Sequence, residues 1–251
     1  MTPNRVLSID WDYFIDAPID FKASNFPDGG NENLPEYVLD AIWMSRYGQC
    51  AEIQKVKEDT SELVKLRILL KKIINKQNTR VVISDSHKSI YKYLEEQRQS
   101  KLPTEIYNID FHHDAYDFGN EEVDCGNWFK KFIDSKNAHV LDKFMWVRRE
   151  DSELSGEEMI DDNSSIGIPR DLYGTFQLVF LCRSGCWSPP HLDDKFLSLC
   201  RFLCKLHDKV DIVDDSILRS RYNKQFKSNV TEHRNIIKSI IGGEKVENTT
   251  K

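Results

Sequence analysis

The chain has 251 residues, of which 39% are hydrophobic and 30% charged, and this composition indicates a globular protein with a sizeable core rather than a disordered or membrane-spanning one. Its net charge of −6 at pH 7 argues against a nucleic-acid binder, because such proteins contact phosphates through basic surfaces. No apolar run is as long as a membrane span and the start lacks a signal-peptide profile. We therefore expect a cytoplasmic protein with reduced thiols and no membrane partner, and a homo-oligomer stays open.

The first predicted strand, residues 6–9, runs directly into Asp10 and Asp12, whose spacing places both carboxylates on one side of an extended chain. Residues 16–35 are rich in Pro, Gly, Asn and Asp and predict a long loop, of the kind that often closes over a ligand. A helix follows, capped by Asn33 and ending near residue 47. Asp59 then caps the clearest amphipathic helix of the chain. Its apolar residues at helical spacing are Leu63, Leu66, Leu69, Leu70 and Ile73.

In the middle of the chain, a strand at 81–83 ends close to His87 and is followed by a helix over 88–98. The strand at 106–109 leads into Asp110, His112 and Asp114, of which alternate side chains share one face. A helix after residues 125–128 and a strand at 144–147 come next. Residues 150–174 are acidic and polar with little periodicity, which predicts a surface excursion that can lie over a pocket.

The last core strand, 178–181, precedes a helix opened by residues 188–190. Cys200 and Cys204 fall on the predicted apolar face of that helix, where a free cysteine behaves as a small hydrophobe. Because the paired CxxC spacing of zinc sites is absent, we do not expect a structural zinc ion. Residues 210–213 predict either an edge strand or a short helix, residues 231–241 predict a further helix, and the tail 242–251 is expected to fray.

Strands that alternate with helices predict a three-layer α/β/α fold with a mainly parallel central sheet, in a single domain over 1–251. In such sheets, ligands bind beyond the carboxyl ends of the strands. The acidic and imidazole side chains of three separate strands fall at that edge. Each alone has an ordinary alternative: charged turns are usually solvated, and a lone histidine such as His87 more often packs or caps a helix.

Together these side chains make a metal-ligand set of four carboxylates and two imidazoles. Two divalent ions balance four carboxylates, and oxygen-rich ligation without thiols favours manganese over zinc. Two ions about 3.5–4 Å apart would activate a shared water, so we expect a hydrolase. The predicted ligands are Asp10, Asp12, His87, Asp110, His112 and Asp114.

The same residues resemble the motifs of the arginase–agmatinase–deacetylase superfamily. Residues 110–114 resemble its Asp-Ala-His-x-Asp motif, residues 8–12 resemble its Ser-Phe-Asp-Val-Asp motif, and His87 matches the histidine of its Gly-Gly-Asp-His segment. The Asp-x-Asp strand comes first here and late in arginases, which suggests a circular permutation. With CGNW and CRSGCW downstream, the arrangement is similar to an atypical arginase-like family that includes enzymes converting arginine to ornithine within ribosomally made peptides.

The resemblance implies that Asp10 and Asp110 bridge two manganese ions, that His87 and Asp114 complete one site, and that His112 and Asp12 complete the other. Two departures matter. The glutamate that binds the guanidinium group in arginases is replaced by Ser184 in the stretch 183–185, and Asn127 is followed by Trp128 and Phe129 rather than leading to a proton-shuttling histidine. The candidates left for binding substrate are Asp16, Asp28, Glu32, Asp117, Asn127 and Ser184. The candidates for proton transfer are His113 and Asp114.

These patterns favour a manganese-dependent hydrolase that converts an arginine in a precursor peptide to ornithine, with release of urea. Long polar loops and the missing arginase substrate residues favour a peptide substrate over free arginine. Two alternatives stay open: a metal-dependent amide hydrolase of the deacetylase kind that uses one ion at Asp10, Asp110 and His112, and a non-catalytic binding module that keeps the metal as a structural element.

Overall fold

The structure is a computed structural model and describes residues 3–32, 34–98, 102–117, 119, 122–135 and 140–243. Seven parallel strands form the central sheet, in the order β7-β6-β5-β1-β8-β4-β9. The strands are β1 (Asn4–Asp10), β4 (Arg80–Ser84), β5 (Thr104–Ile109), β6 (Leu141–Arg148), β7 (Ser164–Ile166), β8 (Leu178–Cys182) and β9 (Val210–Ile212). Of the two alternatives predicted for residues 210–213, an edge strand and a short helix, the structure has the edge strand.

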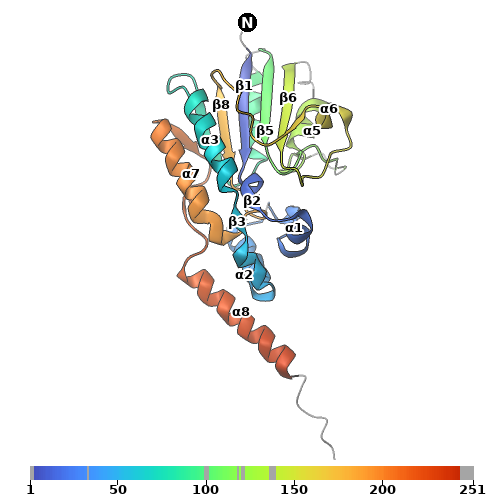
Figure 1. Cartoon of the computed structure of the whole chain (residues 1–251), viewed down its shortest axis with the longest axis vertical. Coiled ribbons are helices and arrows are strands. Elements are labelled where there is room, and N and C mark those ends of the chain that lie inside the picture. Colours follow the sequence, from blue (N-terminus) through green and yellow to red (C-terminus); the bar gives the residue numbers. More distant parts are fainter. Residues whose placement is uncertain are drawn as a thin grey trace, which may run out of the picture.

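Helices cover both faces of this sheet. The helices α3 (Thr60–Ile73) and α7 (Asp193–Leu206) bury their apolar stripes against one face, together with the odd-numbered residues Leu7 and Ile9 of β1. The helices α4 (Ser89–Arg98) and α5 (Trp128–Asp134) cover the other face, where Val6 of β1 points. Figure 1 shows α3 and α7 on one side of the strands and α5 on the other. The predicted three-layer α/β/α fold with a parallel sheet is confirmed.

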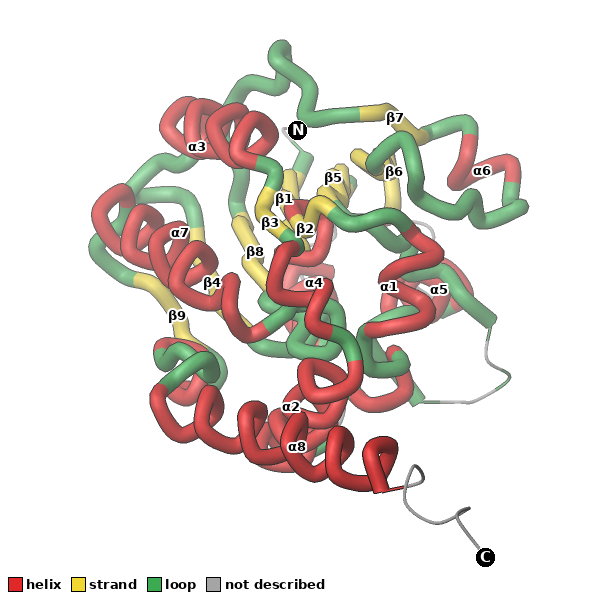
Figure 2. The backbone as a smooth tube through the Cα atoms, turned by 60° about the horizontal axis from the view of Figure 1, so that its bottom comes forward, coloured by secondary structure: helices red, strands yellow, loops and turns green. Residues whose placement is uncertain are grey.

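Further elements gather beyond the carboxyl ends of the strands, at the lower end of the sheet in Figure 1. They include α1 (Ile19–Asn25) and α2 (Glu36–Gln49), and α2 packs along α8 (Lys224–Gly243), as Figure 2 shows. The short elements are η1 (Trp11–Phe14), β2 (Ile15–Asp16), η2 (Gly29–Asn31), η3 (Ala51–Lys55), β3 (Lys57–Glu58), α6 (Glu158–Asp161), η5 (Pro190–Leu192) and η6 (Asp215–Leu218).

The register of the central strands brings their carboxyl ends to one level. Ile9 of β1 pairs with Ile109 of β5 on one side and with Leu181 of β8 on the other, and Ser84 of β4 pairs with Cys182 of β8. The residues that follow these strands therefore meet at one edge of the sheet. All five residues of β8 are buried, as expected for a strand covered on both faces.

Several sequence predictions need correction. The stretch 16–35 is not a plain loop, because α1 and η2 form within it, and the excursion 150–174 contains α6 and the edge strand β7. In both stretches, apolar residues pack against distant parts of the chain, as Phe26 does against Trp43, and such contacts override local composition. The predicted Asn33 cap lies outside the described residues, and the helix after it runs to Gln49, past residue 47.

Asp59 caps α3 as predicted, since its carboxylate accepts hydrogen bonds from the amides of Ser61 and Glu62. Cys200 is buried but Cys204 is exposed, so only the first belongs to the core. The C-terminal helix begins at Lys224, earlier than predicted; of the expected frayed tail, residues 242–243 belong to α8 and 244–251 lie outside the described residues. Within the described part of the chain, no helix has the length and apolarity to cross a membrane.

Candidate metal centre

The predicted ligands converge at the carboxyl ends of β1, β4 and β5; β5 neighbours β1 in the sheet, and β8 lies between β1 and β4. Asp10 ends β1 and Asp12 lies in the 3-10 turn that follows it, while His87 follows β4. Asp110, His112 and Asp114 follow β5. Two groups of three residues each place one ligand atom per residue within 4.8 Å of the others. The two groups are Asp10, His87 and Asp110, and Asp12, Asp110 and His112.

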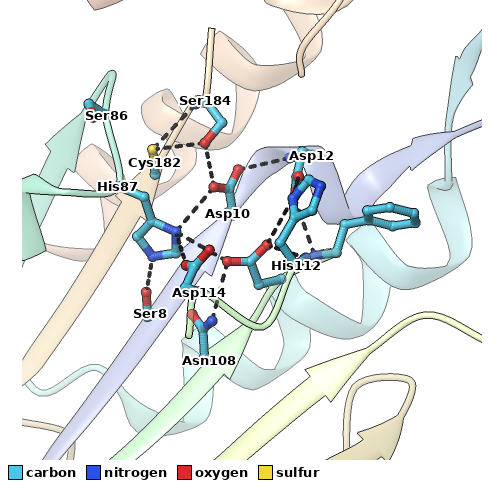
Figure 3. A network of polar contacts seen from close by, with 12 residues as sticks. Ser8, Asp10, Asp12, Ser86, His87, Asn108, His112, Asp114, Cys182 and Ser184 are labelled. Carbon is cyan, nitrogen blue, oxygen red and sulfur yellow. Dashed lines mark hydrogen bonds and ion pairs between the residues drawn. The ribbon is translucent and has the colours of Figure 1, made fainter. Parts of the chain in front are cut away.

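The first group surrounds the imidazole of His87. Its Nδ1 atom lies 3.2 Å from Asp10 Oδ2, 3.1 Å from Asp110 Oδ2 and 2.9 Å from Asp114 Oδ2. The other ring nitrogen, Nε2, makes a 2.6 Å hydrogen bond with the hydroxyl of Ser8. Figure 3 shows the carboxylates of Asp10 and Asp114 directed at the ring while Ser8 lies on its far side. Ser8 thus fixes the ring so that Nδ1 points to the carboxylates.

The second group lies beside the first and shares Asp110 with it. His112 Nδ1 is 2.8 Å from Asp12 Oδ2 and 4.0 Å from Asp110 Oδ1. Figure 3 shows His112 next to Asp12, on the opposite side of Asp10 from His87. Since one carboxylate belongs to both groups, the arrangement can hold two ions that share a ligand, or a single ion in either half.

Hydrogen bonds from neighbouring residues hold the carboxylates in place. Asp110 accepts from the Asn108 side-chain amide at 3.2 Å and from the backbone amide of His112 at 2.8 Å. The indole N–H of Trp128 donates to Asp114. Such partners orient ligands in metal sites. Nothing in the sequence pattern singled out Asn108 or Trp128, although Asn108 shares a strand face with Asp110.

Two residues at this edge adopt a left-handed backbone that non-glycine residues rarely occupy. Asp114 has φ 54° and Ser184, which follows β8, has φ 47°. The Ser184 hydroxyl donates a hydrogen bond to Asp10. Strained backbone of this kind costs about 1–3 kcal/mol per residue and concentrates at functional sites. Both residues present their side chains to the same cluster of carboxylates.

The electrostatics of the cluster fit a bound cation. Burial, with the neighbouring charges of Asp12 and Asp110, raises the pKa of Asp10 to about 7, and burial and Asp114 also raise the pKa of Asp110. Burial alone would lower the pKa of His112, but the charge of Asp12 raises it to about 9. Two buried ligand atoms, Asp12 Oδ2 and His87 Nδ1, make close ion-pair contacts within the cluster but no hydrogen bond of good geometry among the described residues. A divalent ion would balance the carboxylates and could bind both atoms.

A cavity of about 560 Å³ opens onto the cluster. Asp10, His112 and Asp114 line it, together with residues of the stretch 19–32 and of the segments 124–126 and 184–187. Its volume falls in the range usual for ligand pockets. The predicted metal ligands therefore face a space that can admit a substrate.

Glu32 stands out among the candidates for binding substrate. Its carboxylate is buried, lines the cavity and lies 3.5 Å from both the Ser184 hydroxyl and the Cys186 thiol. Burial, followed by the negative charge of Asp10, raises the pKa of Glu32 to about 7. Asp28 also lines the cavity but caps the amide of Gly30. Glu32 is thus a buried carboxylate that a cationic ligand would ionise.

The structure does not bring the remaining candidates to the cavity. Asp16 is exposed and pairs with Arg149 at 3.5 Å, and Asp117 is exposed and accepts from the amide of Gly119. Asn127 is buried and bonds within its own turn, to the backbone at Asp124 and Glu122. None of the three is among the described residues lining the cavity.

His113 is packed away from the metal ligands. Its ring lies 4.0 Å from the ring of Tyr116, its Nδ1 accepts the amide of Ala115 at 3.1 Å, and it does not line the cavity. Burial lowers the pKa of His113 to about 4, so the ring is neutral. Of the two candidates for proton transfer, only Asp114 faces the cavity.

The sequence reasoning missed Lys22, a buried lysine of α1 that lines the cavity. Its position in a stretch that reads as a loop gave no signal. Comparison of the chain with family models, with curated proteins and with solved structures finds no match in any of the three. The geometry and chemistry of the site therefore carry the functional argument.

Proposed function

We propose that the chain is a manganese-dependent hydrolase that removes urea from an arginine side chain within a precursor peptide and leaves ornithine. The observation that carries the proposal is the pair of Asp/His groups that share Asp110 at the edge of a cavity. Two divalent ions held there would supply a hydroxide near neutral pH, which is the nucleophile that attack on a guanidinium carbon needs.

Glu32 is the proposed partner of the guanidinium group. The resemblance leaves a serine, Ser184, where arginases place their guanidinium-binding glutamate, and the carboxylate of Glu32 lies 3.5 Å from that serine hydroxyl. A residue from a different segment thus supplies a carboxylate next to the vacated position. A carboxylate can accept two parallel N–H bonds from a guanidinium group, which would orient it as well as bind it.

Asp114 is the proposed group for proton transfer. It lines the cavity and its Oδ2 lies 2.9 Å from His87 Nδ1, so it faces both the ligand cluster and the space for substrate. Its left-handed backbone and the hydrogen bond from Trp128 fix the direction of its carboxylate. A proton released when a water is activated can pass to Asp114 and on to the departing amine.

The proposal is tested by two measurements on the purified protein. Elemental analysis should find two manganese ions per chain, and incubation with an arginine-containing peptide should release urea and shorten the side chain to ornithine, read by mass spectrometry. Urea from free arginine alone would remove the peptide substrate from the proposal. Two bound ions without urea from either substrate would remove the reaction.

An amide hydrolase is the second candidate. The sequence predicts its one ion at Asp10, Asp110 and His112, but the buried group that contains both aspartates has His87 as its imidazole. That group offers one ion two carboxylates and one imidazole. This candidate predicts one tightly held zinc ion per chain and acetate release from an acetylated lysine peptide. A protein with a full metal complement and no turnover in either assay would instead be a metal-stabilised binding module.

A further inference from the structure

Lys22 is a buried cation on the wall of the cavity. The side chain belongs to α1, its residue is 2% exposed, and its Nζ atom has no hydrogen-bond partner among the described residues. Its ammonium lies 3.4 Å from the centre of the Phe111 ring, which also lines the cavity. The Phe111 ring offers its electron-rich face, so it stabilises the charge without accepting a normal hydrogen bond.

An ammonium in this setting is incompletely satisfied. It carries three N–H donors, and each donor buried without an acceptor is costly. Burial lowers the pKa of Lys22 to about 8, and the charge of Asp12 acts in the opposite direction. The described residues nevertheless give Lys22 no ion pair within 4 Å. A ligand that enters the cavity can supply the missing acceptor.

We propose that Lys22 binds a carbonyl or carboxylate oxygen of the ligand. The ligand would then lie between two buried charges, with its guanidinium group at Glu32 and its oxygen at Lys22; this placement rests on the proposed function. Lys22 favours the same orientation by repulsion, because a guanidinium group beside a buried ammonium would be a like-charge pair. The ligand class is an arginine derivative that keeps an oxygen on its main chain.

The oxygen can come from the carboxylate of a free amino acid or from the carbonyl of a peptide. Three ligands separate these sources: agmatine has the guanidinium group and no such oxygen, arginine has a carboxylate, and Nα-acetylarginine N-methylamide has peptide carbonyls. Trp187 lines the cavity, so tryptophan fluorescence can report binding. Stopped-flow fluorescence on the manganese-loaded full chain measures each dissociation constant in the first milliseconds, before turnover.

The wild-type protein should bind at least one of the oxygen-bearing ligands about tenfold or more tightly than agmatine, as expected for a hydrogen bond to a charged group. Lys22→Met should reduce the ratio of the agmatine dissociation constant to that of the oxygen-bearing ligand to about one, while agmatine binds as tightly as before or more tightly. Lys22→Arg should retain most of the ratio. Lys76→Met is the control, because Lys76 is an exposed lysine that pairs with Asp208 away from the cavity.

The possible outcomes separate the proposed role of Lys22 in binding from the proposed urea-releasing reaction. A ratio unchanged by Lys22→Met overturns the inference, as does an equal loss for all three ligands, which would make Lys22 a structural counter-charge of Asp12. No preference in the wild type, or no binding of any oxygen-bearing ligand, also overturns it. Urea release with an unchanged ratio leaves the proposed reaction standing without Lys22. A ratio that falls in a protein that releases no urea leaves Lys22 standing without the reaction.

Discussion

Asp110→Asn should remove both ions at once, because Asp110 belongs to both ligand groups. The amide keeps the size of the side chain and can keep an acceptor for the His112 amide, now 2.8 Å away. It removes the negative charge that each ion needs. Asp12→Asn affects the His112 group alone, so it should remove one ion and leave the group around His87. The wild type and these two variants should therefore hold two, zero and one manganese ions per chain.

The number of bound ions also predicts how much manganese stabilises the folded state of each variant. A ligand at one hundred times its dissociation constant stabilises the folded state by about 2.7 kcal/mol, so two independent ions contribute about 5 kcal/mol. In a chain of this size, about 1 kcal/mol shifts Tm by about 2–4 °C. Manganese should therefore raise the Tm of the wild type by about 10–20 °C, that of Asp12→Asn by about half as much, and that of Asp110→Asn hardly at all.

Without metal, Asp110→Asn should raise the Tm relative to the wild type instead of lowering it. The pKa of Asp10 is raised to about 7, so the folded state holds this proton more tightly than the unfolded state. That stabilisation is complete below about pH 4 and is lost as the pH rises through about 7. Chelated wild-type protein should thus melt at a lower temperature at pH 8 than at pH 6. Asp110→Asn removes one of the repelling carboxylates and should melt higher than chelated wild type at pH 8.

Elemental analysis and differential scanning fluorimetry, each with manganese and with a chelator, measure these quantities. Asp117→Asn is a matched control, because Asp117 is an exposed aspartate outside the cavity. Two ions retained by Asp110→Asn would refute the shared ligand. Loss of both ions in Asp12→Asn would show that the two groups are not separable.

Three further variants test other parts of the structure. Arg221→Met should lower the free energy of unfolding, measured by urea titration, by about 3–5 kcal/mol. The buried Arg221 pairs with Asp193 and donates to the carbonyls of Gly185 and Ser188, so the substitution leaves the charge of Asp193 buried without its partner. A loss under about 1 kcal/mol would contradict this. Burial lowers the pKa of His113 to about 4 from an ordinary 6.5, so lowering the pH between these values should reduce the free energy of unfolding by up to about 3 kcal/mol. His113→Phe should lose about 3 kcal/mol less than the wild type over the same pH range. An equal loss in both proteins would refute the lowered pKa of His113. Glu32→Gln should weaken agmatine about 10–100-fold at an unchanged manganese content, and equal affinity would exclude Glu32 as the guanidinium partner.

The cluster of carboxylates and imidazoles could be predicted from the sequence because a short-range rule places Asp10 and Asp110. Asp10 and Asp110 each follow a short apolar strand, and neighbouring parallel strands end at one edge of a sheet. The expected alternation along an extended chain is wrong for the other ligands, because Asp12 lies in η1 and β5 ends at Ile109. The turn after β5 nevertheless directs His112 at the ligand cluster and His113 away from it. Placing Asp10 and Asp110 needed no knowledge of the contacts between distant residues.

The walls of the cavity could not be predicted in the same way. Glu32 lies beside Ser184 across 152 positions of the chain, and Lys22 meets Phe111 across 89 positions. Both residues come from a stretch whose Pro, Gly and Asn content reads as loop, yet it folds because Phe26 packs against Trp43. Such pairings depend on tertiary contacts, to which local composition is blind.

The burial of the site would couple folding to the proposed metal binding. Asp10, Asp110 and His87 are each at most 3% exposed, and carboxylates crowded in this way repel one another unless they take up protons or a cation. At low pH Asp10 keeps a proton, and as the pH rises through about 7 a cation is needed to offset its charge. The metal-free protein should consequently lose stability as the pH rises through about 7, and bound ions would add their binding free energy to the stability of the fold. A site built only to hold the fold together would gain nothing from a cavity of about 560 Å³ opening onto its ligands, which is why the arrangement favours catalysis over a structural role.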